Sequence, residues 1–181
     1  EDMIECVNAF YEGMVARGEE MKHHPDYKTG ENYAYLGLPP CFLIFDEYVA
    51  FLEMLGTKES KSLLSQLKKI VMLGRQAGYF LVVACQRPDA KYFSDGIRDN
   101  FIFRVGLGRI SELGYGMLFG SDVKKQFFQK RIKGRGYCDV GTSVISEFYT
   151  PLVPKGHDFL QTIGSLALAR QAVSEKQKEI E

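Results

Sequence analysis

The hydrophobic pattern is most continuous in one short segment, which two carboxylates follow at once. Residues 41–45 (CFLIF) contain no polar side chain, and Asp46 and Glu47 come next. A strand without polar alternation is typical of a parallel sheet that helices cover on both faces. We therefore predict a central strand, buried on both faces, that ends in two adjacent acids.

The pattern after this segment predicts a helix and a second strand. Apolar residues recur at helical spacing over 60–77, and Gly78 follows as a typical stop signal. Residues 79–85 (YFLVVAC) form another apolar run of strand length. Strand, helix and strand of these lengths predict a βαβ unit with parallel strands.

The rest of the chain predicts shorter elements. Residues 2–14 have helical periodicity, and the polar stretch 22–40 contains prolines and glycines typical of a connector. Further along we predict, in chain order, a helical turn at 95–99, a strand at 102–107, helices at 112–119 and 123–130, a β-hairpin of strands 137–140 and 144–149, and a helix at 159–173. The charged tail 174–181 has little to bury, and we expect it to fray.

The two acids after the first strand admit two interpretations. Asp46 and Glu47 stand where open α/β sheets bind ligands, beyond the carboxyl end of a strand. In phosphoryl-transfer ATPases one acid at this place holds magnesium, usually through its waters, and a second polarises the attacking water. This is the Walker B arrangement. The same residues also suit a helix N-cap followed by a first-turn acid, so this segment leaves both interpretations open.

A polar group follows the second strand as well. Gln86 comes after Cys85 and precedes Arg87 and Pro88, so it lies beside the two acids if the strands are neighbours. A glutamine there is able to donate to a γ-phosphate or orient the attacking water. Alternatively, its amide satisfies the backbone of the loop. The adjacent Walker B pattern favours the nucleotide interpretation.

Composition narrows the classes of function. The 181 residues carry 23 Lys plus Arg and 23 Asp plus Glu, so a global positive charge for nucleic acid is absent and any DNA contact requires a local patch. The four cysteines are far apart, as in reducing compartments, and they and the histidines lack metal-ligand spacing. Because no apolar run reaches membrane-spanning length and no signal peptide is visible, we expect a soluble, cytosolic piece of a longer protein.

Several segments together resemble the motor domain of the FtsK/SpoIIIE family of double-stranded DNA translocases. They are LIFDE, GRQAGYFLVVACQRPD and DNFIFRVGLG, with MVARGEEM and KGRGYCDVGTS in comparable places. One branch, the FtsK-like coupling proteins of Gram-positive conjugative transposons and integrative conjugative elements, is similar also over GENYAYLGLPP, IFDEYVAFLEMLGTKES, IRDNFIFRVGLGRISELGYGMLFG and ISEFYTPLVPKGHDF. ACQRP departs from the family's commoner ATQRP.

This resemblance implies a fold and an activity. The fold is α/β, the C-terminal portion of a RecA-like P-loop NTPase domain, with a mainly parallel sheet flanked by helices and a C-terminal β-hairpin. The activity is ATP-driven, Mg²⁺-dependent pumping of double-stranded DNA through a hexameric ring. A separate region would anchor the ring to the cytoplasmic face of the bacterial membrane, where a relaxase or other conjugation proteins are further possible partners.

The resemblance also assigns roles to residues. By position, Asp46 is the metal ligand, Glu47 the catalytic base and Gln86 the γ-phosphate sensor, and all three lie at the nucleotide. An arginine that reaches the neighbouring subunit's ATP is expected too. Its candidates are Arg75, Arg98 and Arg104, of which Arg104 and Arg75 rank first because they fall in matching segments; for each, a solvated or salt-bridged arginine is the alternative.

One family motif does not occur in the chain. The phosphate-binding loop G-x-x-x-x-G-K-[ST] is missing, and the nearest stretch, 136–142, lacks the lysine and precedes a strand-like run. In the family this loop lies upstream of the other motifs. We therefore expect the chain to begin downstream of it, to be unable to hydrolyse ATP alone, and to bind ATP no better than millimolar.

The densest positive cluster is a candidate DNA contact. It comprises Lys124, Lys125, Lys130, Arg131, Lys133 and Arg135, interleaved with Phe127 and Phe128. Such a cluster would neutralise phosphates, with strong salt dependence. The alternative, which we favour, is a solvated helix face whose phenylalanines pack inward.

Two further functions stay open at this point. One is chromosome segregation by a translocase of the same family. The other is a catalytically silent oligomerisation or DNA-binding module, but such a module needs none of Asp46, Glu47 and Gln86. Conjugative DNA transfer is the function that the sequence favours.

Overall fold

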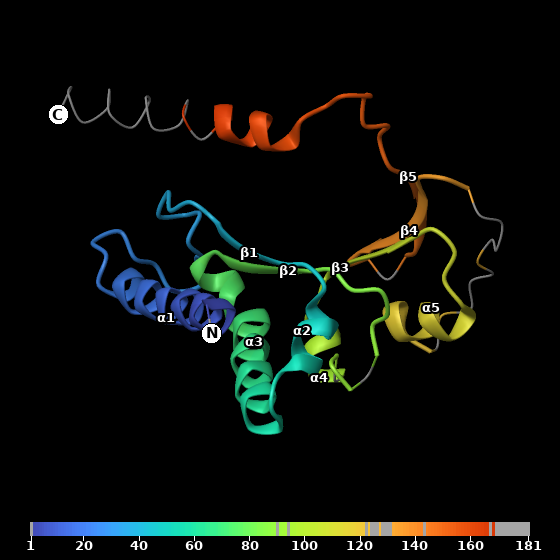
Figure 1. Cartoon of the computed structure of the whole chain (residues 1–181). Coiled ribbons are helices and arrows are strands. Elements are labelled where there is room, and N and C mark those ends of the chain that lie inside the picture. Colours follow the sequence, from blue (N-terminus) through green and yellow to red (C-terminus); the bar gives the residue numbers. More distant parts are fainter. Residues whose placement is uncertain are drawn as a thin grey trace. The chain divides into compact units, whose positions relative to one another are not determined.

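A computed structural model describes the chain except for residues 1, 90, 94, 122, 124–126, 128–131, 143, 167 and 169–181. It divides into two units, Glu1–Phe148 and Tyr149–Glu181. The elements of the first unit, with β5 at its end, are α1 (Asp2–Lys22), β1 (Cys41–Phe45), α2 (Tyr48–Met54), α3 (Thr57–Ala77), β2 (Tyr79–Val83), α4 (Asp95–Arg98), β3 (Phe103–Leu107), α5 (Glu112–Phe119), β4 (Arg135–Val140) and β5 (Ser146–Tyr149) (Figure 1).

The predicted βαβ unit is present. Strands β1 and β2 pair in parallel, with Cys41 opposite Tyr79 and Phe45 opposite Val83, and the connection between them contains α2 and α3. Helix α3 ends at Gly78, which has φ 77° and donates its N–H to the Gly74 carbonyl. Gly74 lets the helix approach the strand closely, because a Cβ there would collide with the Tyr79 carbonyl oxygen. Both glycines thus set the helix-to-strand turn.

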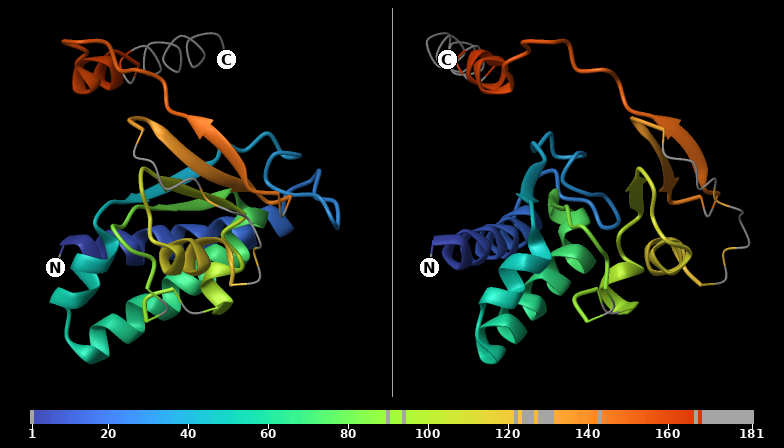
Figure 2. Two further views of the ribbon diagram at one scale, coloured as in Figure 1. Left: turned by 90° about the vertical axis from the view of Figure 1, so that its right-hand side faces the viewer. Right: turned by 45° about the vertical axis from the view of Figure 1, so that its right-hand side comes forward.

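The main core lies between this sheet and the helices on one of its faces. Buried residues of α1, α2 and α3 meet the side chains of β1 and β2 that point toward them, and α1 and α3 lie together on that side (Figure 2). The core residues are Val7, Met14, Phe45, Tyr48, Leu52, Leu63, Leu67, Ile70, Ala77, Tyr92, Phe93 and Ile97. Burial of this apolar surface stabilises the arrangement that positions the ends of β1 and β2.

The prediction that the first strand is buried on both faces is wrong for the described chain. Its burial alternates: Phe42 is 59% and Ile44 74% exposed, and Val82 on β2 is exposed beside them. The physical reason is that the described helices that pack on β1 and β2 contact only the face formed by Leu43, Phe45 and their neighbours. The apolar run was therefore a correct signal for a strand and a misleading signal for two-sided cover.

A second sheet holds β3, β4 and β5 in that order. The predicted third strand is present, but β3 pairs antiparallel with β4, with Phe103 opposite Val140 and Leu107 opposite Gly136. The predicted hairpin corresponds to β4 and β5. A smaller core covers one side of this sheet, where Tyr115 and Phe119 of α5 pack with Tyr137 and Ile145.

Most helix predictions agree with the structure. The helix at 112–119 is α5, the turn at 95–99 is α4, and the first helix runs further than predicted, to Lys22. The prediction missed α2, which has only 7 residues. The helix predicted at 123–130 falls mostly on residues outside the described part.

The second unit contains a helical segment at 159–166, within the range predicted for the last helix. The tail 174–181 lies outside the described residues. Among the described helices, none has the length and apolar content that crossing a membrane requires.

Candidate functional site

The ends of β1 and β2 bring the two predicted polar segments to one edge of the parallel sheet. The ladder continues past the strands, because Ala84 donates its N–H to the Phe45 carbonyl at 2.9 Å and Tyr48 donates to the Ala84 carbonyl at 3.2 Å. Asp46 and Glu47 follow one strand and Gln86 follows the other. We call these three residues the carboxyl edge.

Asp46 and Glu47 both expose their side chains. One carboxylate oxygen of Asp46, Oδ1, accepts the backbone N–H of Glu47 at 2.9 Å, and no described residue forms a hydrogen bond with Oδ2. Glu47 has φ 49° and ψ 37°, and it is the one non-glycine residue with positive φ in the described part of the chain. Such a conformation costs about 1–3 kcal/mol and is concentrated at functional sites.

The geometry gives little support to the helix-cap interpretation of these acids. Glu47 occupies the N-cap position of α2, all of which is described, yet its side chain makes no capping hydrogen bond. Its left-handed backbone also differs from the extended conformation that N-cap residues adopt. Among the described residues, Asp46 Oδ1 accepts a hydrogen bond from the adjacent N–H of Glu47, which precedes the helix. The helix-cap interpretation therefore leaves the positive φ and the exposed side chain of Glu47 unexplained.

Gln86 is exposed, and its side-chain amide has no hydrogen-bond partner among the described residues. The neighbouring Cys85 is half-buried; burial raises the pKa of its thiol, the backbone N–H of Arg87 lowers it, and the carboxylates of Glu47 and Asp89 raise it. The sequence identified Gln86 through its place after an apolar run.

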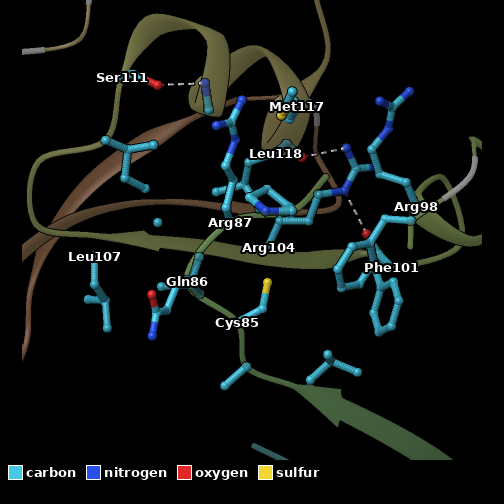
Figure 3. A pocket seen from close by; sticks show the side chains of 18 of the residues that line it. Cys85, Gln86, Arg87, Arg98, Phe101, Arg104, Leu107, Ser111, Met117 and Leu118 are labelled. Atoms are coloured by element: carbon cyan, nitrogen blue, oxygen red, sulfur yellow. Dashed lines mark hydrogen bonds between the residues drawn. The ribbon is translucent and has the colours of Figure 1, made fainter. Parts of the chain in front are cut away.

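A cavity of about 640 Å³ opens between the end of β2 and strand β3. Residues 83–88 form one wall, and 103–107 with α5 form the other, as Figure 3 shows for Gln86 and Arg104. Arg87, which the sequence did not single out, also lines it and pairs with Asp89 at 3.1 Å. Its position directly after Gln86 was the available signal.

The arginine candidates lie in different places. Arg104 on β3 lines the cavity, where its Nε donates to the Phe101 carbonyl at 2.8 Å and its Nη1 to the Leu118 carbonyl at 3.3 Å (Figure 3). Arg98, at the end of α4, also lines the cavity and has its Nε 3.6 Å from Asp99. Arg75 is exposed in the last turn of α3, so it lies at the opposite edge of the sheet from Glu47.

The basic cluster is described only in part, since Lys124, Lys125, Lys130 and Arg131 lie outside the described residues. Lys133 is exposed. Arg135 is 4% exposed, lies over the Tyr137 ring and has Nε 3.9 Å from Glu147. Phe127 stacks on Tyr115 with ring centroids 3.9 Å apart, so this phenylalanine packs inward, whereas Phe128 lies outside the described residues.

The carboxyl edge fits magnesium better than a metal that needs several protein ligands. In the described part of the chain no group of three or more His, Cys, Asp or Glu side chains is arranged to hold a metal ion. Magnesium in nucleotide sites keeps several waters and uses one or two carboxylates with substrate phosphates. Asp46, whose Oδ2 has no hydrogen-bond partner among the described residues, and the exposed Glu47 supply that number of carboxylates.

Comparison with known proteins supports the same family. No protein-family model matches the chain. Over 161 residues, 89% of the chain, it is 58% identical to the FtsK domain-containing protein YdcQ of Bacillus subtilis (strain 168). It is a close homologue of an FtsK domain-containing protein. The matched residues are 33% of YdcQ, so the chain spans about one third of the length of that relative.

Two solved structures share the fold. One is the cytoplasmic domain of the Thermomonospora curvata type VII secretion ATPase EccC, with TM-score 0.60, 20% identity, and coverage of 87% of this chain and 19% of that one. The other is the pCW3 conjugation coupling protein TcpA in its monomer form with ATPγS, with TM-score 0.60, 18% identity, and coverage of 81% and 43%. These two likenesses confirm the predicted α/β fold.

Proposed function

We propose that this chain is part of the motor domain of an ATP-driven double-stranded DNA translocase that acts as a coupling protein in conjugative DNA transfer. The observation that carries the proposal is the meeting of Asp46, Glu47 and Gln86 at one edge of the parallel sheet. The identity to an FtsK domain-containing protein supports a translocase. The fold shared with a conjugation coupling protein, together with the branch-specific segments of the sequence, favours conjugation over chromosome segregation.

In the proposed site each residue has one task. Asp46 would hold Mg²⁺, and the bound ion would supply positive charge near the phosphates of ATP. Glu47 accepts a proton from the attacking water at its carboxylate. Gln86 donates its amide N–H to the γ-phosphate. The left-handed backbone of Glu47 turns this residue away from the strand direction before α2 begins.

The proposed assembly is a hexameric ring around DNA, anchored to the membrane by a region outside this chain and met by a relaxase or other conjugation proteins. An arginine from one subunit would reach the ATP of its neighbour. Arg75 is exposed and thus accessible to a neighbouring subunit, whereas Arg104 already donates to two carbonyls of its own chain. Of the two described members of the basic cluster, Lys133 is exposed, and in this proposal it contacts DNA phosphates.

A mating assay combined with an ATPase assay tests this function. We expect the full-length protein to hydrolyse ATP faster with double-stranded DNA, and a strain that carries Glu47→Gln to lose conjugative transfer while chromosome segregation stays normal. Glu31→Gln, which changes an exposed acid in the connector, is the matched control. Unchanged transfer in the Glu47→Gln strain, or a segregation defect in its place, contradicts the conjugative role.

A further inference from the structure

A hydrogen-bonded network joins helix α2, which begins after Glu47, to the loop that carries Gln86. We call residues 84–93 the Gln86 loop; residue 90 within it lies outside the described part. Tyr48, the first residue of α2, holds this loop twice. Its backbone N–H donates to the Ala84 carbonyl at 3.2 Å, and its Oη donates to the Tyr92 carbonyl at 3.3 Å.

Tyr92 ties the far end of the loop to the same helix. The residue is 5% exposed, and its Oη donates to Oε1 of Glu53, on α2, at 2.5 Å. Lys91 donates from Nζ to Tyr92 Oη at 2.8 Å, and this hydrogen bond raises the pKa of Lys91. The phenol therefore uses its proton for Glu53 and a lone pair for Lys91, a charge-assisted arrangement with a fixed direction.

The loop between these anchors is internally braced. Tyr92 and Phe93 both donate their N–H to the Asp89 carbonyl, at 2.9 and 3.0 Å. Asp89 also pairs with Arg87, the residue after Gln86, at 3.1 Å. The Phe93 ring lies 5.1 Å from that of Tyr48. Tyr92 is thus linked through Asp89 to Arg87, the residue beside Gln86.

A buried tyrosine needs none of these polar bonds merely to fill space, because a phenylalanine packs the same volume without a hydroxyl to satisfy. The hydrogen bonds of Tyr48 and Tyr92 are directional, so they fix the Gln86 loop at one position along α2. At the near end of the same helix stands Glu47. Helix α2 therefore connects Glu47, which precedes its first residue, to Glu53, which bonds Tyr92 near its last residue.

We propose that Tyr92 is a positioning residue that sets Gln86 relative to Glu47, so that the two act on the same nucleotide. The proposal rests on the proposed ATPase function. In the proposed reaction Tyr92 contacts neither the nucleotide nor the attacking water, and it acts only through the Gln86 loop. Loss of its hydroxyl then lowers turnover more than it lowers nucleotide binding, because a small misplacement of catalytic groups is costly in the transition state.

The test measures kcat and KM for ATP in the full-length protein with DNA present. We expect Tyr92→Phe to lower kcat about tenfold, the effect of one charge-assisted hydrogen bond, with KM within about twofold. Glu53→Ala should match it, Glu53→Gln should restore most of kcat because the amide oxygen still accepts the phenol proton, and the double variant should lose no more than either single one. Tyr11→Phe, on α1, is the control.

Hydrogen exchange supplies a readout that does not depend on turnover. Tyr92→Phe should speed exchange at the amides of Tyr48, Tyr92 and Phe93, which the network holds, and leave those of α1 unchanged. An active wild-type protein with unchanged kcat in Tyr92→Phe overturns the positioning role, as does unchanged exchange. A wild-type protein without any ATPase activity but with faster exchange in the variant overturns the proposed function and leaves the structural coupling standing.

Discussion

Two polar regions of the first unit hold their side chains in opposite ways. At the carboxyl edge, Asp46, Glu47 and Gln86 are exposed, and the amide of Gln86 has no hydrogen-bond partner among the described residues. In the second sheet, Arg104 donates to two carbonyls and Arg135 is buried beside Glu147. Side chains whose bonds are made inside the chain stabilise it, whereas side chains held open at a strained turn are available to a ligand.

Loss of the Gln86 amide should have the largest effect on ATP turnover after the Glu47→Gln change, which is described at the end. Gln86→Ala in the full-length protein should lower ATP turnover about a hundredfold, the usual cost of one donor aimed at developing charge. Stability should change little, because the side chain is exposed. Steady-state ATPase assays check this, with Gln66→Ala on α3 as the control. Full activity in Gln86→Ala removes Gln86 from the site.

The next prediction tests whether Arg104, in the second sheet, has a structural role. If it is structural, Arg104→Gln should lower the free energy of unfolding of the 181-residue chain by about 2 kcal/mol, since charged hydrogen bonds to the Phe101 and Leu118 carbonyls are lost. Urea denaturation measures this, and Arg109→Gln, an exposed arginine on the wall of the same cavity, should change little. Unchanged stability together with lost turnover would identify Arg104 as the arginine that acts on a neighbour's ATP.

The strained backbone at Glu47 predicts a smaller effect with the opposite sign. Glu47→Gly should raise the free energy of unfolding by about 1 kcal/mol, because glycine adopts positive φ without steric cost. The matched change Lys61→Gly, inside α3, should lower it by about 1 kcal/mol. Denaturation curves of both variants check the pair. A Glu47→Gly variant that is less stable than wild type contradicts the assignment of strain.

The smallest effect concerns pH. Burial raises the pKa of Cys85 above its ordinary value of 9.0 and also raises the pKa of Tyr48. Both groups stay neutral in the folded chain after they ionise in the unfolded one. Their contribution to stability is therefore complete below pH 9 and is lost as pH rises from there through the raised values. Thermal unfolding between pH 8 and pH 11 measures this loss, and Cys85→Ala should reduce its slope.

The sequence predicted the parallel pair and the edge because those depend on local signals. The apolar runs gave β1 and β2, Gly78 gave the end of α3, and the polar residues after each strand gave Asp46, Glu47 and Gln86. The parallel orientation of the two strands then follows from the βαβ connection. The sequence could not predict which face of the sheet the helices cover, since the exposed Phe42 and Ile44 have the same apolar character as the buried Phe45.

The remaining differences come from long-range contacts. The partners of Arg104 are backbone carbonyls, and a residue pattern does not specify which carbonyl a side chain reaches. The bond from Tyr92 to Glu53 joins residues 39 positions apart, so neither residue signals the other. Tyr48, Tyr92 and Phe93 are all buried in the main core.

Glu47→Gln tests the central claim most directly. In the full-length protein, ATP turnover and ATP affinity are measured in parallel for wild type and for this variant, which keeps the size of the side chain and removes its ability to accept a proton. We predict turnover about 10²- to 10⁴-fold lower, with affinity for ATP retained. Undiminished turnover in a variant that binds ATP normally would contradict the assignment of the carboxyl edge as the site of hydrolysis.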